Sequence, residues 1–151
     1  MVPRLLILGH GAERTGPPIF LLRLLRWVRA HAELEVAVVL LDGGPLLDDI
    51  RALAPTFVAG VDRLGDVPPA DVAYVNTAGS IRLLDHLPAP PGRVVTHLHE
   101  LSTGLEAHLR PEDLQRILDV SERILVVSDA VASDLAARTG TPEDRLTIVP
   151  G

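Results

Sequence analysis

The last third of the chain constrains the fold most, because it contains one complete strand, helix and strand unit. An apolar run at 123–127 leads into Ser128, a helical pattern covers 129–139, and a Gly-Thr-Pro turn precedes a second apolar run at 146–149. Two buried strands joined through a helix within about thirty residues are typical of an αβ crossover. Since such a crossover brings the chain back in the same direction, the sequence predicts parallel strands here.

The same alternation of short apolar runs and helical patterns extends through the chain. Several of the runs are apolar on both faces, as in strands of a parallel sheet that helices cover on each side. The pattern therefore predicts a Rossmann-like, doubly wound α/β fold with a mainly parallel sheet, in a single domain that spans residues 1–151. The expected strands are 4–9, 34–41, 56–59, 72–76, 93–98, 123–127 and 146–149.

Composition excludes several classes of protein. The chain has no Cys, so it has neither disulfides nor a cysteine nucleophile, and with no secretory signal we expect a cytoplasmic location. The net charge of −6, the single Trp, the single Tyr and the two Phe argue against a nucleic-acid-binding surface. No apolar run reaches the roughly 18–20 residues that a bilayer crossing needs.

The first helix is expected at about 17–31, and its pattern has two interpretations. Apolar residues, Leu21 and Leu25 among them, line one face, while Arg23 and Arg26 lie roughly on another. We favour a core helix with a solvated arginine face, because each crossover of an α/β fold needs an apolar helix face of this kind. The alternative is peripheral contact with an anionic membrane.

The loop from Gly9 to Pro18 joins the first expected strand to this helix. Its glycines do not have the spacing of a dinucleotide fingerprint, since the sixth residue counted from Gly9 is Arg14. Small residues and free amides at a helix start suit a phosphate or a sugar hydroxyl, which makes the loop a candidate ligand site. The alternative is an ordinary connection between a strand and a helix.

Two histidines mark the end of the fifth expected strand. Side chains alternate along a strand, so His97 and His99 are expected on the same side, with His99 at the end where ligands collect. We interpret His97 as a structural residue and His99 as a hydrogen-bonding group of a site. A metal centre is the alternative, but we find no further cluster of Asp and His to complete it, and no metal ligand is predicted. Ser128 and Asp129 form a good helix N-cap, and capping alone explains both.

Three stretches resemble the N-terminal domain of retaining GT-B glycosyltransferases of family 4. The segment TGPPIFLLRLLRWV, beginning at Thr15, resembles the "tGAP..LL..LA..L" start in a subset of that family, with Pro17 in place of the usual Ala. The strand end THLHEL, residues 96–101, resembles "HiHEL". The stretch 124–151, with its "VS" turn and final "VPG", resembles the end of the family's N-terminal domain.

The resemblance implies the acceptor-binding half of an enzyme that transfers a sugar from a nucleotide-sugar donor to an acceptor hydroxyl. The acceptor would be a small molecule, a glycan or a lipid-linked molecule, and neither a cofactor nor a catalytic metal is expected. The donor would bind mainly to a C-terminal domain that lies outside this chain, so the fragment alone would be inactive. The family match places His99 at the reacting centre and makes Thr15, Gly16, Asn76, Glu100 and Ser128 candidate substrate contacts. The alternative is a stand-alone binding or regulatory module of flavodoxin-like type.

Overall fold

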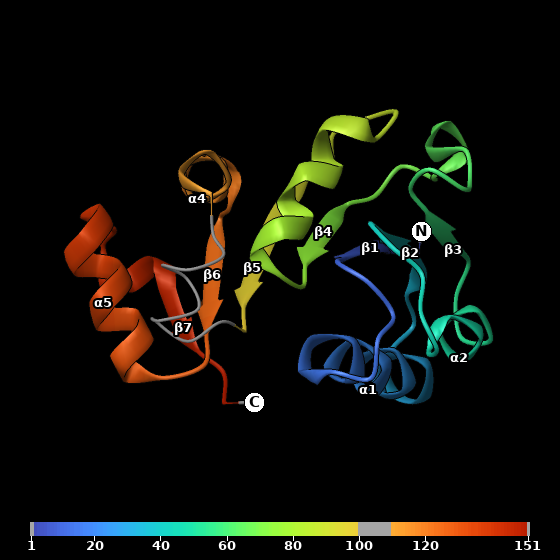
Figure 1. The fold of residues 1–151 in the computed structure, drawn as a ribbon, viewed down its shortest axis with the longest axis horizontal. Coiled ribbons are helices and arrows are strands. Elements are labelled where there is room, and N and C mark those ends of the chain that lie inside the picture. The colour runs from blue at the N-terminus through green and yellow to red at the C-terminus, as the bar shows by residue number, and fades with distance from the viewer. Residues whose placement is uncertain (1, 100–109, 151) are drawn as a thin grey trace.

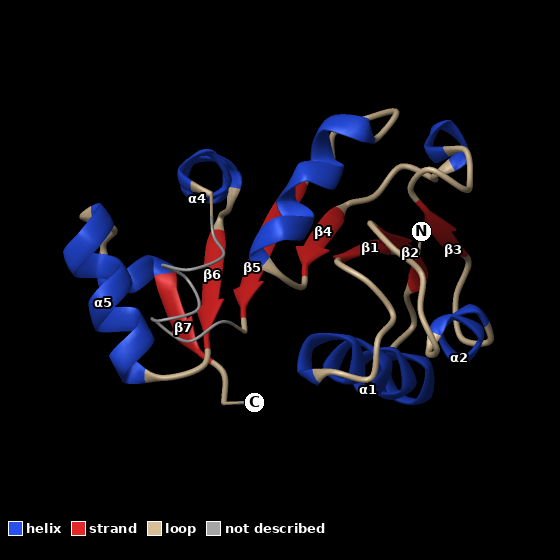
Figure 2. Ribbon diagram, viewed as in Figure 1, coloured by secondary structure: helices blue, strands red, loops and turns tan. Residues whose placement is uncertain are grey.

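The computed structural model describes residues 2–99 and 110–150 and contains one sheet of seven parallel strands. Helical segments lie above and below the strands (Figures 1 and 2). This arrangement confirms the predicted Rossmann-like α/β fold. The strands are β1 (Arg4–Gly9), β2 (Glu35–Leu40), β3 (Thr56–Val58), β4 (Val72–Val75), β5 (Arg93–Leu98), β6 (Arg123–Val126) and β7 (Leu146–Ile148).

The helical segments follow the strands as a doubly wound fold requires. The predicted first helix begins one residue earlier than expected, at Gly16, and the helix after Ser128 has the predicted bounds. Within the described residues, none of the helices combines the length and apolar character that crossing a bilayer demands. The segments are α1 (Gly16–His31), α2 (Leu47–Arg51), α4 (Pro111–Val120) and α5 (Asp129–Thr139), with 3-10 turns η1 (Leu64–Asp66), η2 (Ala78–His86) and η3 (Glu143–Arg145).

The strand order is β3-β2-β1-β4-β5-β6-β7. Strands β2 and β3 are added on one side of β1, and β4 to β7 on the other, so the strand order reverses between β1 and β4. The register pairs Leu8 of β1 with Val39 of β2 on one side and with Val75 of β4 on the other. In an open parallel sheet the loops diverge at such a reversal and leave a crevice at the carboxyl ends of the strands. The topology therefore places the candidate site beyond the ends of β1 and β4.

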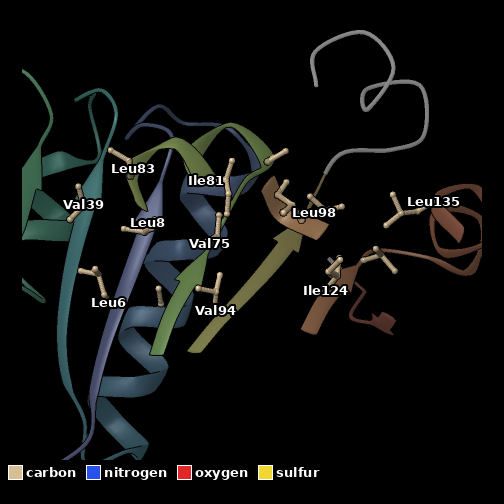
Figure 3. Close-up of a cluster of buried hydrophobic side chains, with 14 of the residues drawn as sticks. Leu6, Leu8, Val39, Val75, Ile81, Leu83, Val94, Leu98, Ile124 and Leu135 are labelled. Carbon is tan, nitrogen blue, oxygen red and sulfur yellow. The ribbon is translucent and has the colours of Figure 1, made fainter. Parts of the chain in front are cut away.

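Two apolar cores lie on opposite faces of the sheet, because successive strand residues point to opposite sides. Leu6 and Leu8 of β1 join a core with η2, α4 and α5, whereas Ile7 joins a second core with α1 and α2. Figure 3 shows the first of these cores, in which Leu8 and Ile81 come from β1 and η2. Each strand near the centre is thus apolar on both faces, as the sequence pattern predicted.

The interpretation of α1 as a core helix is confirmed. Pro18, Leu21, Leu22, Leu25 and Val28 are buried, and the opposite side of the helix exposes its arginines to solvent. Contact of that outer side with a membrane stays a prediction.

Candidate functional site

A cluster of polar and aromatic side chains occupies the carboxyl edge of the sheet at the reversal point. Asn76 directly follows β4 and His99 directly follows β5. The start of α1 contacts both, through Pro17 and Phe20 respectively. Three segments that are far apart in the sequence are therefore brought together by parallel strand pairing. Two of the candidates predicted from the sequence, Asn76 and His99, are in direct contact.

Asn76 links the start of α1 to His99. Its side-chain amide nitrogen donates to the Pro17 carbonyl oxygen over 2.9 Å, and its Oδ1 atom lies 3.0 Å from Nε2 of His99. Asn76 is only 1% exposed. A buried amide must satisfy its hydrogen-bonding groups within the protein, and here each polar atom has a partner. The role of this side chain is therefore to hold α1 and His99 in fixed positions.

His99 belongs to a cluster of four aromatic rings next to Asn76. The rings of His97 and His99 stack with centroids 3.9 Å apart and an interplanar angle of 29°. Phe20 of α1 contacts both histidines edge-on, with centroids 5.1 Å from His97 and 4.9 Å from His99. The Tyr74 hydroxyl is hydrogen-bonded to Nδ1 of His97. The two histidines therefore point to the same side of the sheet, as the alternation of strand residues predicted, and packing limits the rotation of both rings.

Burial keeps both imidazoles neutral. It lowers the pKa of His97 to about 4, with a further lowering from the neighbouring His99, and it lowers the pKa of His99 to about 4. Burial also raises the pKa of Tyr74, so the phenol stays protonated. An imidazole that is neutral near pH 7 has one nitrogen that donates and one that accepts. His99 can thus exchange a hydrogen bond with a ligand without carrying charge.

The start of α1 offers fewer free amides than the sequence suggested. Gly16, Pro17 and Pro18 occupy the first turn, and the Ile19 amide donates to the Thr15 carbonyl oxygen over 3.1 Å. Proline has no amide hydrogen, so only Gly16 retains an uncommitted donor there. The helix start therefore offers a ligand fewer free amides than expected, because neither Pro17 nor Pro18 has one. A phosphate would find little to bind at this helix end.

The other candidate contacts occupy different places. Thr15 and Gly16 are exposed at the start of α1. Ser128 caps α5 by accepting a hydrogen bond from the Val131 amide over 3.3 Å, which confirms its capping role. Glu100 lies outside the described residues. Across residues 2–99 and 110–150, no group of three or more His, Cys, Asp and Glu side chains is placed to hold a metal ion.

The sequence analysis did not identify Phe20 or Tyr74 as residues of the candidate site, although both contact the histidine pair. The available signals were weak: Phe20 is an aromatic residue one turn into a helix that follows a candidate loop, and Tyr74 is a polar aromatic in an otherwise aliphatic strand. Either residue type is common in a core. Their contacts depend on strand register and helix placement.

A hollow of about 340 Å³ lies at the opposite, amino-terminal edge of the sheet. Its walls include Leu5, Val36, Pro68 and Pro69, together with the Arg4 and Glu35 ion pair. None of the side chains around His99 lines it. We place the candidate site at the carboxyl edge all the same, because the polar groups and the topological reversal coincide there.

Comparison with known proteins finds similarity in three-dimensional structure and none in sequence family. No family model matches the sequence, and no curated protein matches it. Among solved structures, Anabaena Alr3699/HepE in complex with UDP and glucose has a TM-score of 0.70 and 15% sequence identity, over 98% of this chain and 44% of that one. The same protein in complex with UDP-glucose gives a TM-score of 0.69 and 16% identity, over 97% and 43% of the two chains. The chain thus has the fold of somewhat less than half of those structures.

Proposed function

We propose that this chain is the acceptor-binding half of a glycosyltransferase that uses a nucleotide-sugar donor. The observation that carries the proposal is the Asn76 and His99 pair, fixed at the reversal point of a sheet with the fold of a protein solved with UDP-glucose. Open α/β sheets bind ligands at this point. The family resemblance at Thr15–Val28 and around His99 supports the same function.

In the proposed reaction, the anomeric carbon of the donor sugar exchanges its bond to the diphosphate for a bond to the acceptor hydroxyl oxygen. The nucleoside diphosphate leaves with the bonding electron pair, and the hydroxyl proton is released. By resemblance to family 4, the anomeric configuration is retained. His99 is the catalytic residue that we assign, since it is a neutral hydrogen-bonding group at the sheet edge.

The remaining candidates have distinct proposed roles. Thr15 and Gly16 are exposed at the start of α1, so they are open to substrate. Ser128 ends the turn after β6, one strand further along the sheet, and Glu100 follows His99 in the sequence. Asn76 is a positioning residue, because both polar atoms of its side chain are already bonded within the protein.

We propose that a second domain supplies most of the donor site. The start of α1 lacks the amides that would bind a diphosphate, because two of its first three residues are proline. The chain also spans only 44% of the structure solved with UDP and glucose. A donor held by another domain would approach the carboxyl edge of this one.

The test compares the isolated chain with the whole protein that its gene encodes. First, the reading frame is followed past the codon for Gly151. Then Met1–Gly151 and the complete product are each incubated with a panel of radiolabelled nucleotide sugars, and release of the nucleoside diphosphate is measured. We expect activity in the longer protein and none in the isolated chain. Turnover by the isolated chain, or a stop codon directly after Gly151, contradicts the proposal, and the stop codon favours a self-sufficient binding module.

A further inference from the structure

A groove runs along the amino-terminal edge of the sheet, at the opposite end of the strands from His99. Its larger part is the hollow of about 340 Å³, a size within the range of small-molecule pockets. A second hollow of about 290 Å³ shares four of its residues, Arg4, Glu35, Pro69 and Ala70. We call the two hollows together the amino-terminal groove. A ligand bound there would be separate from the proposed transfer site.

The walls of the amino-terminal groove are held in place without a ligand. Arg4 of β1 lies opposite Glu35 of β2 in the strand register, and its Nε donates to the Glu35 carboxylate over 2.7 Å. The Arg4 amide donates to the Asp71 carboxylate over 2.9 Å. Prolines, whose φ is fixed, form a further part of the wall: Pro55, Pro68 and Pro69. Because the walls are already ordered, binding a ligand there costs little conformational entropy.

The larger hollow offers apolar surface to a ligand. Leu5, Leu34 and Val36 line it and are each only partly buried, whereas Leu6 and Ala37 beside them are buried. A molecule that covers the three partly buried side chains removes apolar surface from water, which favours binding. The occupant is therefore expected to have an apolar body.

The same hollow has one uncompensated positive charge. Arg4 is paired with Glu35, so these two charges offset each other. Arg29, in the last turn of α1, is exposed, and its guanidinium forms no hydrogen bond or ion pair with a described residue. Asp71 adds a negative charge to the smaller hollow only. The groove is thus complementary to a molecule with a single negative charge beside Arg29.

We propose that the amino-terminal groove binds a small molecule with an apolar body and one carboxylate, which pairs with Arg29. A phosphate ester would bring a second negative charge near pH 7, and the described residues that line the larger hollow include no second unpaired arginine. Such a ligand would be an effector of this chain and not a substrate of the transfer reaction. The proposal therefore stands or fails independently of the proposed function.

The test is a titration of the ¹⁵N-labelled chain Met1–Gly151 with naphthoate, followed in ¹H–¹⁵N correlation spectra at pH 7. Saturable shifts are expected at the backbone amides of Val36, Ala37 and Ala70, which line the larger hollow, and none at Asn76. The absence of shifts up to the solubility limit of naphthoate, or shifts at Asn76 in their place, overturns the proposal.

Two related molecules test the single charge. Naphthamide has nearly the same shape and no charge, so it should bind about two- to five-fold more weakly, as expected for the loss of one exposed ion pair. Naphthyl phosphate should bind no more tightly than naphthoate. Equal binding of naphthamide, or tighter binding of the phosphate, overturns the proposal.

Two substitutions on α1 test the role of Arg29. Arg29→Gln should raise the Kd of naphthoate by about two- to five-fold. Arg26→Gln makes the same change at an exposed arginine that lines neither hollow, so it should leave the Kd unchanged. Both side chains are exposed, so both variants should fold. Equal effects of the two substitutions overturn the assignment to Arg29.

Discussion

Acidification is expected to destabilise the fold through His97. Its side chain is fully buried, and burial together with the neighbouring His99 lowers its pKa from 6.5 to about 4. The unfolded chain therefore binds a proton near pH 6.5, whereas the folded chain resists protonation until about pH 4. Because the unfolded state holds more protons within this window, stability falls as the pH falls through it.

The size of the effect follows from the shift in pKa. Each pKa unit is worth 1.36 kcal/mol, so the change of His97 from 6.5 to about 4 corresponds to a loss of about 3 kcal/mol between neutral pH and pH 4. His99 acts in the same direction, since burial lowers its pKa too. Burial acts to raise the pKa of Asp113, but the hydrogen bonds and the positive charges of Arg82 and Arg110 together lower it from 3.8, so this acid titrates below the window.

The assay is urea unfolding at a series of pH values, followed by far-ultraviolet circular dichroism. His97→Phe keeps an aromatic ring in the stack and cannot titrate, so its stability should depend less on pH, by about 3 kcal/mol between pH 7 and pH 4. His86→Gln removes an exposed histidine and should keep the pH dependence of the unmodified protein. If His97→Phe loses stability with acid as steeply as the unmodified protein, the reasoning from burial is refuted.

Three further substitutions have expected effects on the free energy of unfolding, each measured by urea denaturation. Ser128→Ala removes the cap of α5 and should cost about 1 kcal/mol, whereas no loss would remove the capping role. Gly44→Ala should cost well over about 1 kcal/mol, because φ is +153° and the new Cβ would meet the Ala12 backbone at 2.5 Å; Gly65→Ala, with open space around it, should be near neutral. Asp113→Asn should cost about 1–3 kcal/mol, because this buried carboxylate holds two arginines, and an unchanged midpoint would contradict that.

Much of the fold could be predicted from the sequence because its signals are local. The strands of a covered parallel sheet are apolar on both faces, and the runs at 4–9 and 93–98 have this pattern over the observed lengths of β1 and β5. The cap at Ser128 and the turn at Gly140, where φ is +69°, explain why both ends of α5 were predicted. Other strands end one residue early, since fraying at strand ends depends on neighbours.

The candidate site could be predicted only in part. His97 and His99 could be assigned to one side of a strand because alternation is a local property. The bonds from Asn76 to Pro17 and His99 join segments that meet only through strand order and register. The contacts of Phe20 and Tyr74 depend on the same placement. The small number of free amides at the start of α1, in contrast, was predictable from Pro17 and Pro18, because both prolines fall inside the expected helix as well as the observed one.

The most direct test of the account is sugar transfer by the complete protein with His99 replaced. Nucleotide-sugar turnover is measured for the unmodified protein, for His99→Gln and for His86→Gln, after circular dichroism has shown that all three are folded. The account predicts that His99→Gln lowers kcat/KM by roughly 10- to 100-fold, which is about 1.4–2.8 kcal/mol of lost transition-state stabilisation, and that His86→Gln leaves it unchanged. Turnover by His99→Gln at the rate of the unmodified protein would contradict the account.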